Sequence, residues 1–194
     1  MLKMPANADS KRKLQVDNLE VVVMVNNALT GLKNKNAGAY FEKMILASCR
    51  EYLDMGIAKI DKAHEPMKVI KSMPRGQYIA CFTSKSEPDF KGTLANGRSI
   101  VFEAKHTDLD RMAYNRLQEN QLNALLKHQE MGAVAFVLCS FGFERFYRVP
   151  LKVWRNMKEL YGHKYFTAAD VEDYRIKACG VRLEFLRGED YGAC

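Results

Sequence analysis

The stretch "PDFKGTLANGRSIVFEAKHT", residues 88–107, decides the fold of this protein. Asn96 and Gly97 form the dipeptide that most often closes a β-hairpin, and apolar residues flank them on both sides. The pattern predicts one strand in "PDFKGTL" and a second in "SIVFEAK". If these strands pair across the turn, Asp89 lies beside Glu103, although 14 residues separate the two in the sequence.

The second strand carries Glu103 and Lys105 on one face, because side chains alternate along a strand, and Ala104 on the other. Two neighbouring carboxylates repel unless a cation lies between them, and hard oxygen ligands favour Mg²⁺ or Mn²⁺. Lys105 would then orient or help to deprotonate a water and offset charge on a phosphate. The alternative is an exposed ion pair between Glu103 and Lys105, which contributes little. The apolar residues "SIVF" favour the metal site.

Apolar periodicity along the remaining chain predicts further helices and strands. They are a helix over 39–55 ended by Gly56, strands over 57–63 and 77–84, a helix over 112–131 ended by Gly132, a strand in "AVAFVLCSF" paired with "ERFYRVP", a helix over 151–160, and a last strand in "VRLEFL". The interval 66–76 is predicted to be a loop or an extended projection. This order indicates the α/β class, with a central mixed β-sheet flanked by helices.

The length of 194 residues suits a single domain with appendages. Residues 1–36 form a basic N-terminal tail that is predicted to contain a short helix, with a strand at "VVVMV" as the alternative. Residues 37–194 form the main domain. The longest apolar run near the N-terminus is too short to span a membrane, and no cleavable signal peptide is recognisable.

A formal net charge of +7 indicates an affinity for polyanions, of which nucleic acid is the commonest and an anionic membrane the next candidate. The five cysteines are widely spread without zinc-type spacing, which predicts free thiols in a reducing cytoplasm. The four histidines show no metal-binding spacing either. We therefore expect a cytoplasmic protein with a nucleic-acid partner and no membrane association.

The motifs "PDFKG" and "FEAK" resemble the signature of the PD-(D/E)XK nuclease superfamily, which has a restriction-endonuclease-like fold. The wider context, "GAYFEKMI" at 38–45, "ENQLNALLKHQEMGAVAF" at 119–136 and "FYRVP" at 146–150, resembles its RecU-type Holliday junction resolvases. The resemblance covers roughly residues 36–155. It implies a metal-dependent endonuclease that resolves four-way branched DNA without a nucleotide cofactor. Because a four-way junction has near two-fold symmetry, paired cuts call for a homodimer.

The resemblance also implies roles for individual residues. Asp89, Glu103 and the backbone carbonyl of Ala104 would hold Mg²⁺, for which Mn²⁺ can substitute, while Lys105 would be the catalytic lysine, Gln121 the active-site glutamine, and Glu42 the helix acid that completes the site. From the residues alone, Gln121 reads equally well as an exposed helix glutamine. Glu42 also suits the N-terminus of a helix, where a negative charge is favourable.

The chain departs from the family pattern at Pro88, where many relatives carry threonine, and at His106, where many carry glutamate; the histidine would alter water activation. The interval 66–78, which matches the family's protruding stalk, is short. Five basic residues, Lys33, Lys35, Lys68, Lys71 and Arg75, are predicted to contact DNA phosphates without reading bases. Two other functions remain open. They are a duplex endonuclease of the restriction or repair type on the same fold, and a non-catalytic basic module that binds DNA or docks to protein.

Overall fold

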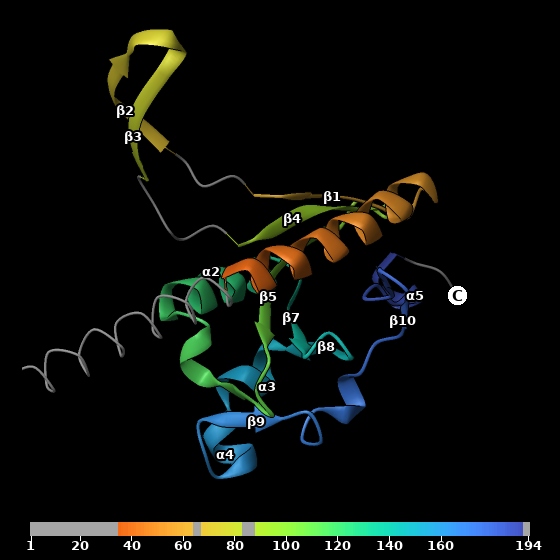
Figure 1. Cartoon of the computed structure of the whole chain (residues 1–194). Coiled ribbons are helices and arrows are strands. Elements are labelled where there is room, and N and C mark those ends of the chain that lie inside the picture. The colour runs from red at the N-terminus through yellow and green to blue at the C-terminus, as the bar shows by residue number, and fades with distance from the viewer. Residues whose placement is uncertain (1–34, 64–66, 83–87, 192–194) are drawn as a thin grey trace, which may run out of the picture. The chain divides into compact units, whose positions relative to one another are not determined.

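The computed structural model describes residues 35–63, 67–82 and 88–191 (Figure 1). The chain divides into two compact units, residues 1–37 and 38–194. The predicted tail helix and Lys33 lie outside the described residues. A helix over 35–54 crosses the boundary between the units, and all other described elements belong to the second unit. No helix in the described ranges is long and apolar enough to cross a membrane.

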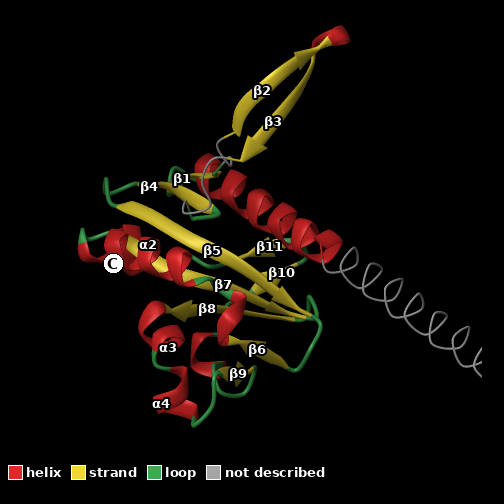
Figure 2. Ribbon diagram, turned by 90° about the vertical axis from the view of Figure 1, so that its left-hand side faces the viewer, coloured by secondary structure: helices red, strands yellow, loops and turns green. Residues whose placement is uncertain are grey.

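A five-stranded sheet forms the centre of the second unit. Its order is β1 (Ala58–Lys62), β4 (Phe90–Leu94), β5 (Ser99–Thr107), β7 (Val134–Phe141) and β8 (Arg145–Pro150). β5 and β7 are parallel, and the other neighbours are antiparallel. Residues 38–54 of the first helix cover one face, and α2 (Glu119–Glu130) lies on the other (Figure 2). The predicted α/β class with a mixed sheet flanked by helices is therefore confirmed.

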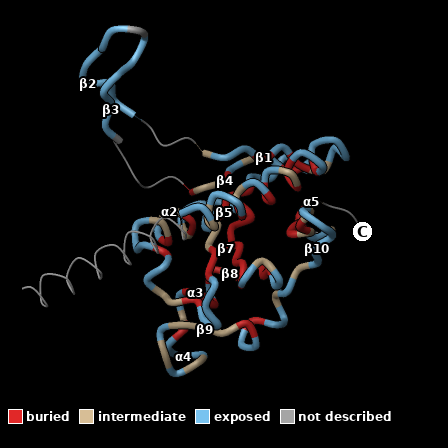
Figure 3. The backbone as a smooth tube through the Cα atoms, viewed as in Figure 1, coloured by how far each residue is buried: buried red, intermediate tan, exposed pale blue. Residues whose placement is uncertain are grey.

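Each face of the sheet has its own hydrophobic core, so both sides of β5 and β7 are buried (Figure 3). Under the first helix, the rings of Phe90, Phe102 and Phe136 stack across three adjacent strands with centroids 4.9 Å apart. On the α2 face, Val101, Val137 and Cys139 share a core with α2 and α3. Odd-numbered residues of β5 thus face α2, and even-numbered residues face the first helix.

The predicted helix over 112–131 is wrong in its first third. Residues Arg111–Ala113 form β6, which pairs with β9 (Tyr165–Thr167), and Tyr114–Arg116 form a 3₁₀ turn. α2 begins only at Glu119, where Gln118 and Gln121 form a reciprocal capping box. A strand pairing between distant segments therefore overrides the local helical pattern.

Two predicted elements near the C-terminus are also corrected. The helix over 151–160 is broken at Asn156 into α3 (Leu151–Arg155) and α4 (Met157–Tyr161). Within "VRLEFL", only Arg182–Leu183 form a strand, β11, which pairs with β10 (Ala178–Cys179), because the following apolar residues fill the core under the first helix instead. A 3₁₀ turn (Glu172–Tyr174) and α5 (Gly188–Tyr191) complete the described elements.

The predicted strand over 77–84 is present but does not join the central sheet. β3 (Gln77–Phe82) pairs with β2 (Met67–Met73) through a 3₁₀ turn at Pro74–Gly76, and the two form a separate hairpin (Figure 1). Every residue of β2 is exposed. The interval predicted to be a loop or projection is therefore a hairpin whose side chains contribute little to the core.

Candidate active site

The β4–β5 hairpin brings Asp89 and Glu103 together. The register pairs Phe90 with Phe102, so the residues that flank this pair, Asp89 and Glu103, lie at the same level of the sheet. Asp89 Oδ2 accepts a hydrogen bond of 3.0 Å from the backbone N–H of Ala104. The predicted adjacency of the two acids is confirmed, and it follows from the turn at Asn96 and Gly97, where Gly97 has a φ of 81°.

Glu103 is buried on the face of β5 that is covered by α2, with 0% of its side chain exposed. Its Oε2 accepts hydrogen bonds from Lys105 Nζ at 2.9 Å and from Gln121 Nε2 at 3.0 Å. Its Oε1 is buried and has no hydrogen-bond partner among the described residues. The alternative of an exposed ion pair on a solvated strand is wrong, because the Glu103 side chain is fully buried and that of Lys105 is only 15% exposed. The buried Oε1 without a partner is costly unless a further group binds it.

The surroundings of Glu103 favour its neutral form in the absence of a bound cation. Burial raises the pKa of Glu103 to about 8, and the neighbouring carboxyl group of Asp89 adds to the shift, while Lys105 opposes it. A carboxyl group held in this way beside a second carboxyl group gains a favourable partner when a cation binds.

The donor atoms at this point fit a hard divalent cation. Asp89 and Glu103 supply carboxylate oxygens, which are ligands of the kind that Mg²⁺ and Mn²⁺ prefer, and the Ala104 carbonyl as a further ligand stays a prediction. Among the described residues no group of three His, Cys, Asp or Glu side chains could hold a metal. The described site therefore offers two carboxylates, and water or substrate would complete the ligand shell.

Gln121 reaches Glu103 from the first turn of α2. Its Oε1 accepts a hydrogen bond from the backbone of Gln118 at 3.2 Å, and its Nε2 donates to Glu103. The capping box thus fixes the amide with its donor toward the carboxylate. The structure excludes the reading of Gln121 as a solvated helix residue, because this side chain holds Glu103 in place.

A sequence profile of the family described as "Recombination protein U" matches residues 36–189. The chain belongs to this family. A similar relative is the Holliday junction resolvase RecU of Streptococcus sanguinis, with 32% identity over 124 residues, 60% of this chain and 62% of the relative. The RecU resolvase of Lactobacillus delbrueckii subsp. bulgaricus is 28% identical over 154 residues, 73% of this chain and 72% of that protein. The chain thus spans less than two thirds of the length of the Streptococcus relative and slightly more than two thirds of the length of the Lactobacillus relative.

Among solved structures, the Holliday junction resolvase Hjc of Archaeoglobus fulgidus is similar to this RecU-family chain with a TM-score of 0.44 and 12% sequence identity. The alignment covers 70% of this chain and 87% of Hjc.

Glu42 lies on the first helix of this RecU-family chain, and it contacts Lys62 rather than the acids of the site. Its Oε2 accepts a hydrogen bond of 2.6 Å from Lys62 Nζ, and Lys62 pairs with Phe90 in the sheet, next to Asp89. No contact within the described ranges joins Glu42 to Asp89 or Glu103, so its role as the completing acid stays a prediction. Sequence reasoning missed Lys62, although it is a basic residue at the end of the strand "IAKIDKA".

His106 does not lie on the face that carries Glu103 and Lys105, so the structure gives no direct contact to support the expected effect on water activation, which stays a prediction. Its Nδ1 lies 3.1 Å from Ser140 Oγ and its Nε2 lies 3.0 Å from Asp108 Oδ1. The buried ring stacks on Phe143 at 4.0 Å between centroids. His106 therefore packs under the first helix, where its ring also lies near Phe41.

Of the predicted DNA-contacting residues, the three whose side chains the structure describes form no hydrogen bond or ion pair with the acids or the lysine of this site. Lys35 is exposed on the first helix, and Lys68 and Lys71 are exposed on β2. Arg75 has its backbone in the 3₁₀ turn at the tip of the β2–β3 hairpin. Their contact with DNA stays a prediction.

We expect Glu103→Gln to change the pH dependence of stability of the metal-free protein. The folded protein holds the Glu103 proton up to about pH 8, whereas an unfolded chain releases it near 4.5. The wild type therefore loses unfolding free energy as the pH rises between these values, and a glutamine, which does not titrate, removes this loss.

Chemical denaturation in EDTA from about pH 5 to about pH 9 measures this difference. Glu119→Gln, at an exposed position in the first turn of α2, is the matched control. Parallel pH profiles for the wild type and Glu103→Gln would contradict the expected burial of an ionisable carboxyl group.

Proposed function

We propose that this chain is a metal-dependent, structure-selective endonuclease that resolves four-way DNA junctions by paired phosphodiester hydrolysis. The observation that carries the proposal is the buried Glu103, whose Oε1 has no partner among the described residues, beside Asp89 and Lys105. Membership of the Recombination protein U family supports it, as do the activities for which the relatives are named. The basic net charge of +7 suits a polyanionic substrate.

In this proposal Asp89, Glu103 and the Ala104 carbonyl hold Mg²⁺, for which Mn²⁺ can substitute. The cation would supply Lewis-acid stabilisation of charge on the phosphate and make water a better nucleophile. Water attacks phosphorus and the 3′ oxygen leaves, and the phosphate gains negative charge during this step. Lys105 places a cationic group beside the phosphate and offsets that charge. Gln121 holds the Glu103 carboxylate in the orientation that leaves Oε1 for the cation.

We further propose that the protein acts as a homodimer, because two symmetric cuts need two sites related by a two-fold axis. The surface of the β2–β3 hairpin supports the proposal that another protein surface covers it. It exposes several large apolar side chains: Met67, Val69, Ile70, Met73, Tyr78 and Ile79. A two-stranded hairpin is marginally stable alone in water and gains from a covering surface. Sedimentation velocity is expected to give twice the mass of 22.2 kDa, and a single monomer species at micromolar concentration would contradict the dimer.

The proposed phosphate contacts come from Lys33, Lys35, Lys68, Lys71 and Arg75. Lys68 and Lys71 lie on β2 among the apolar side chains, so the hairpin combines positive charge with apolar surface. Such contacts fix the protein on the DNA without reading its bases. Binding is therefore expected to weaken steeply as salt concentration rises.

The test is a cleavage assay with a labelled four-way junction and a linear duplex of matched sequence, each in Mg²⁺ and in EDTA. We expect symmetric nicks in the junction in Mg²⁺ and none in EDTA. Equal rates on junction and duplex would favour a restriction- or repair-type endonuclease. Binding without cleavage in Mg²⁺ or Mn²⁺ would favour a non-catalytic DNA-binding module.

A further inference from the structure

A groove of about 520 Å³ lies between α2 and the chain segment that leads into Asp89. Pro88 lines one side of it and directly precedes Asp89. The other described residues that line the groove belong to α2 or directly follow it: Asn120, Asn123, Ala124, Lys127, His128 and Met131. We call this feature the α2 groove.

The α2 groove adjoins the acids of the active site on the same side of the sheet. Gln121, which donates to Glu103, comes directly after Asn120 in the first turn of α2. Ala124 and His128 line the groove and follow Gln121 by three and seven residues, a spacing that places them next to it on the helix surface. The groove therefore begins beside Glu103 and follows α2 away from it.

The side chains along the groove can donate hydrogen bonds and carry no negative charge. Asn123 and Lys127 are exposed, and neither forms an ion pair or a side-chain hydrogen bond within the described part of the chain. No Asp or Glu is among the described residues that line the groove, because Glu119 and Glu130 of α2 lie outside its lining. An ammonium group and amide N–H donors are partners that phosphate oxygens accept.

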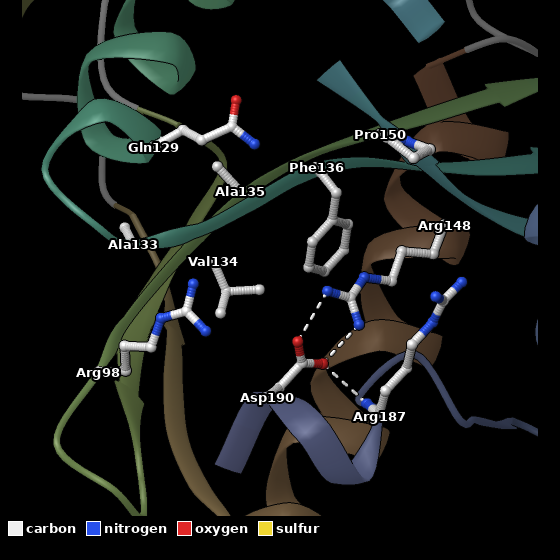
Figure 4. A pocket seen from close by; sticks show the side chains of 10 residues that line it. All are labelled: Arg98, Gln129, Ala133, Val134, Ala135, Phe136, Arg148, Pro150, Arg187 and Asp190. Atoms are coloured by element: carbon white, nitrogen blue, oxygen red, sulfur yellow. Dashed lines mark hydrogen bonds and ion pairs between the residues drawn. The ribbon is translucent and has the colours of Figure 1, made fainter. Parts of the chain in front are cut away.

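A second hollow, lined in part by Arg148 and Asp190, has a different chemistry (Figure 4). Arg148 Nη2 donates to Asp190 Oδ1 at 3.0 Å, and Arg148 Nη1 donates to the carbonyl of Phe185 at 3.2 Å. Its cation is therefore used to fasten the C-terminal segment to β8. The cation of the α2 groove, Lys127, binds no other part of the described chain and is available to a ligand.

We propose that the α2 groove holds the backbone of the DNA strand that is cut, with Lys127 against a phosphate close to the scissile one and Asn123 against a neighbouring backbone oxygen. This inference rests on the proposed function and adds a binding site for the strand on one side of the cut. Lys127 follows Gln121 by six residues, which is about 9 Å along a helix axis. A DNA strand carries one phosphate for about every 3.4 Å of duplex axis, so this length corresponds to roughly two or three nucleotides.

The first test is the salt dependence of junction binding in EDTA. One phosphate contact changes the slope of log affinity against log salt by about 0.9, which is about 3.5-fold in affinity between about 50 and about 200 mM salt. Lys127→Gln is expected to lower the slope by this amount, and Asn123→Lys, which adds a cation to the same groove, is expected to raise it. The control is Lys177→Gln, because Lys177 is exposed and follows Ile176, which packs against the core under the first helix.

The second test locates the contact on the DNA. Junctions are prepared with a single uncharged methylphosphonate at successive linkages on either side of the mapped cut. In the wild type and in Lys177→Gln, one of these linkages close to the cut is expected to weaken binding. In Lys127→Gln the same linkage is expected to have no further effect, because the contact that it removes is already lost.

A lower slope for Lys127→Gln together with this coupling supports the proposal. The proposal is overturned if Lys127→Gln matches Lys177→Gln in both measurements, or if the coupled linkage lies far from the cut. Failure of the nuclease proposal appears separately, as an absence of nicks from the wild type in Mg²⁺. The salt slope needs no cleavage and still reports whether Lys127 contacts a phosphate.

Discussion

Lys105→Met is expected to reduce junction cleavage about a thousand-fold while junction binding in EDTA remains close to that of the wild type. The lysine Nζ lies 2.9 Å from Glu103 Oε2 and is the one side-chain cation that the described structure places against that carboxylate. In the proposed mechanism, charge that develops on the phosphate then loses the compensating cation that the protein itself supplies. Single-turnover cleavage and fluorescence anisotropy measure the two quantities.

Two further variants make the result of Lys105→Met interpretable. Lys152→Met removes an exposed lysine on α3 and is expected to cleave at the wild-type rate. Gln121→Ala removes the other donor to Glu103 Oε2, and a loss of about 10- to 100-fold is expected, as is typical when a residue that orients a ligand is lost. If Lys105→Met cuts as fast as Lys152→Met, Lys105 has no catalytic role.

Gly92→Ala is expected to lower the unfolding free energy by about 3 kcal/mol, a typical cost of overpacking. Gly92 lies on β4 directly opposite Ile60 of β1. A Cβ at this position would lie 2.1 Å from the carbonyl oxygen of Lys59 and 2.7 Å from the Cα of Ile60. Both obstacles are backbone atoms, so β1 has to move away from β4.

The matched control is Gly38→Ala, because a Cβ at Gly38 meets nothing within 4 Å and the residue lies in the first helix. That change is expected to raise stability by a few tenths to about 1 kcal/mol. Urea denaturation of both variants measures the difference. A Gly92→Ala protein as stable as the wild type would show that β1 and β4 leave room for a methyl group between them.

The geometry of the acid pair could be predicted from the sequence because it depends on a local feature. Asn96 and Gly97 set a tight turn, the turn sets the register of β4 and β5, and the register places Asp89 beside Glu103. Alternation along β5 then places Lys105 with Glu103. Each step joins residues close in the chain, where backbone geometry leaves few alternatives.

Long-range packing decided the features that the sequence did not predict. The start of the predicted helix over 112–131 instead forms β6, which pairs with β9. The predicted strand over 77–84 pairs with β2 rather than with the central sheet. The contact of Glu42 with Lys62 joins a helix to a strand end 20 residues away. Local propensity amounts to a fraction of a kcal/mol per residue, which such tertiary contacts exceed.

The sequence by itself determined the class of fold, the hairpin, and the two acids and lysine that the hairpin assembles. Only the tertiary structure decided that Glu103 is buried with Oε1 unpartnered among the described residues, that Gln121 holds its other oxygen, and that His106 faces away. Whether a residue is buried depends on which other segments pack against it. Those segments are distant in the sequence, and no short sequence pattern specifies which of them come into contact.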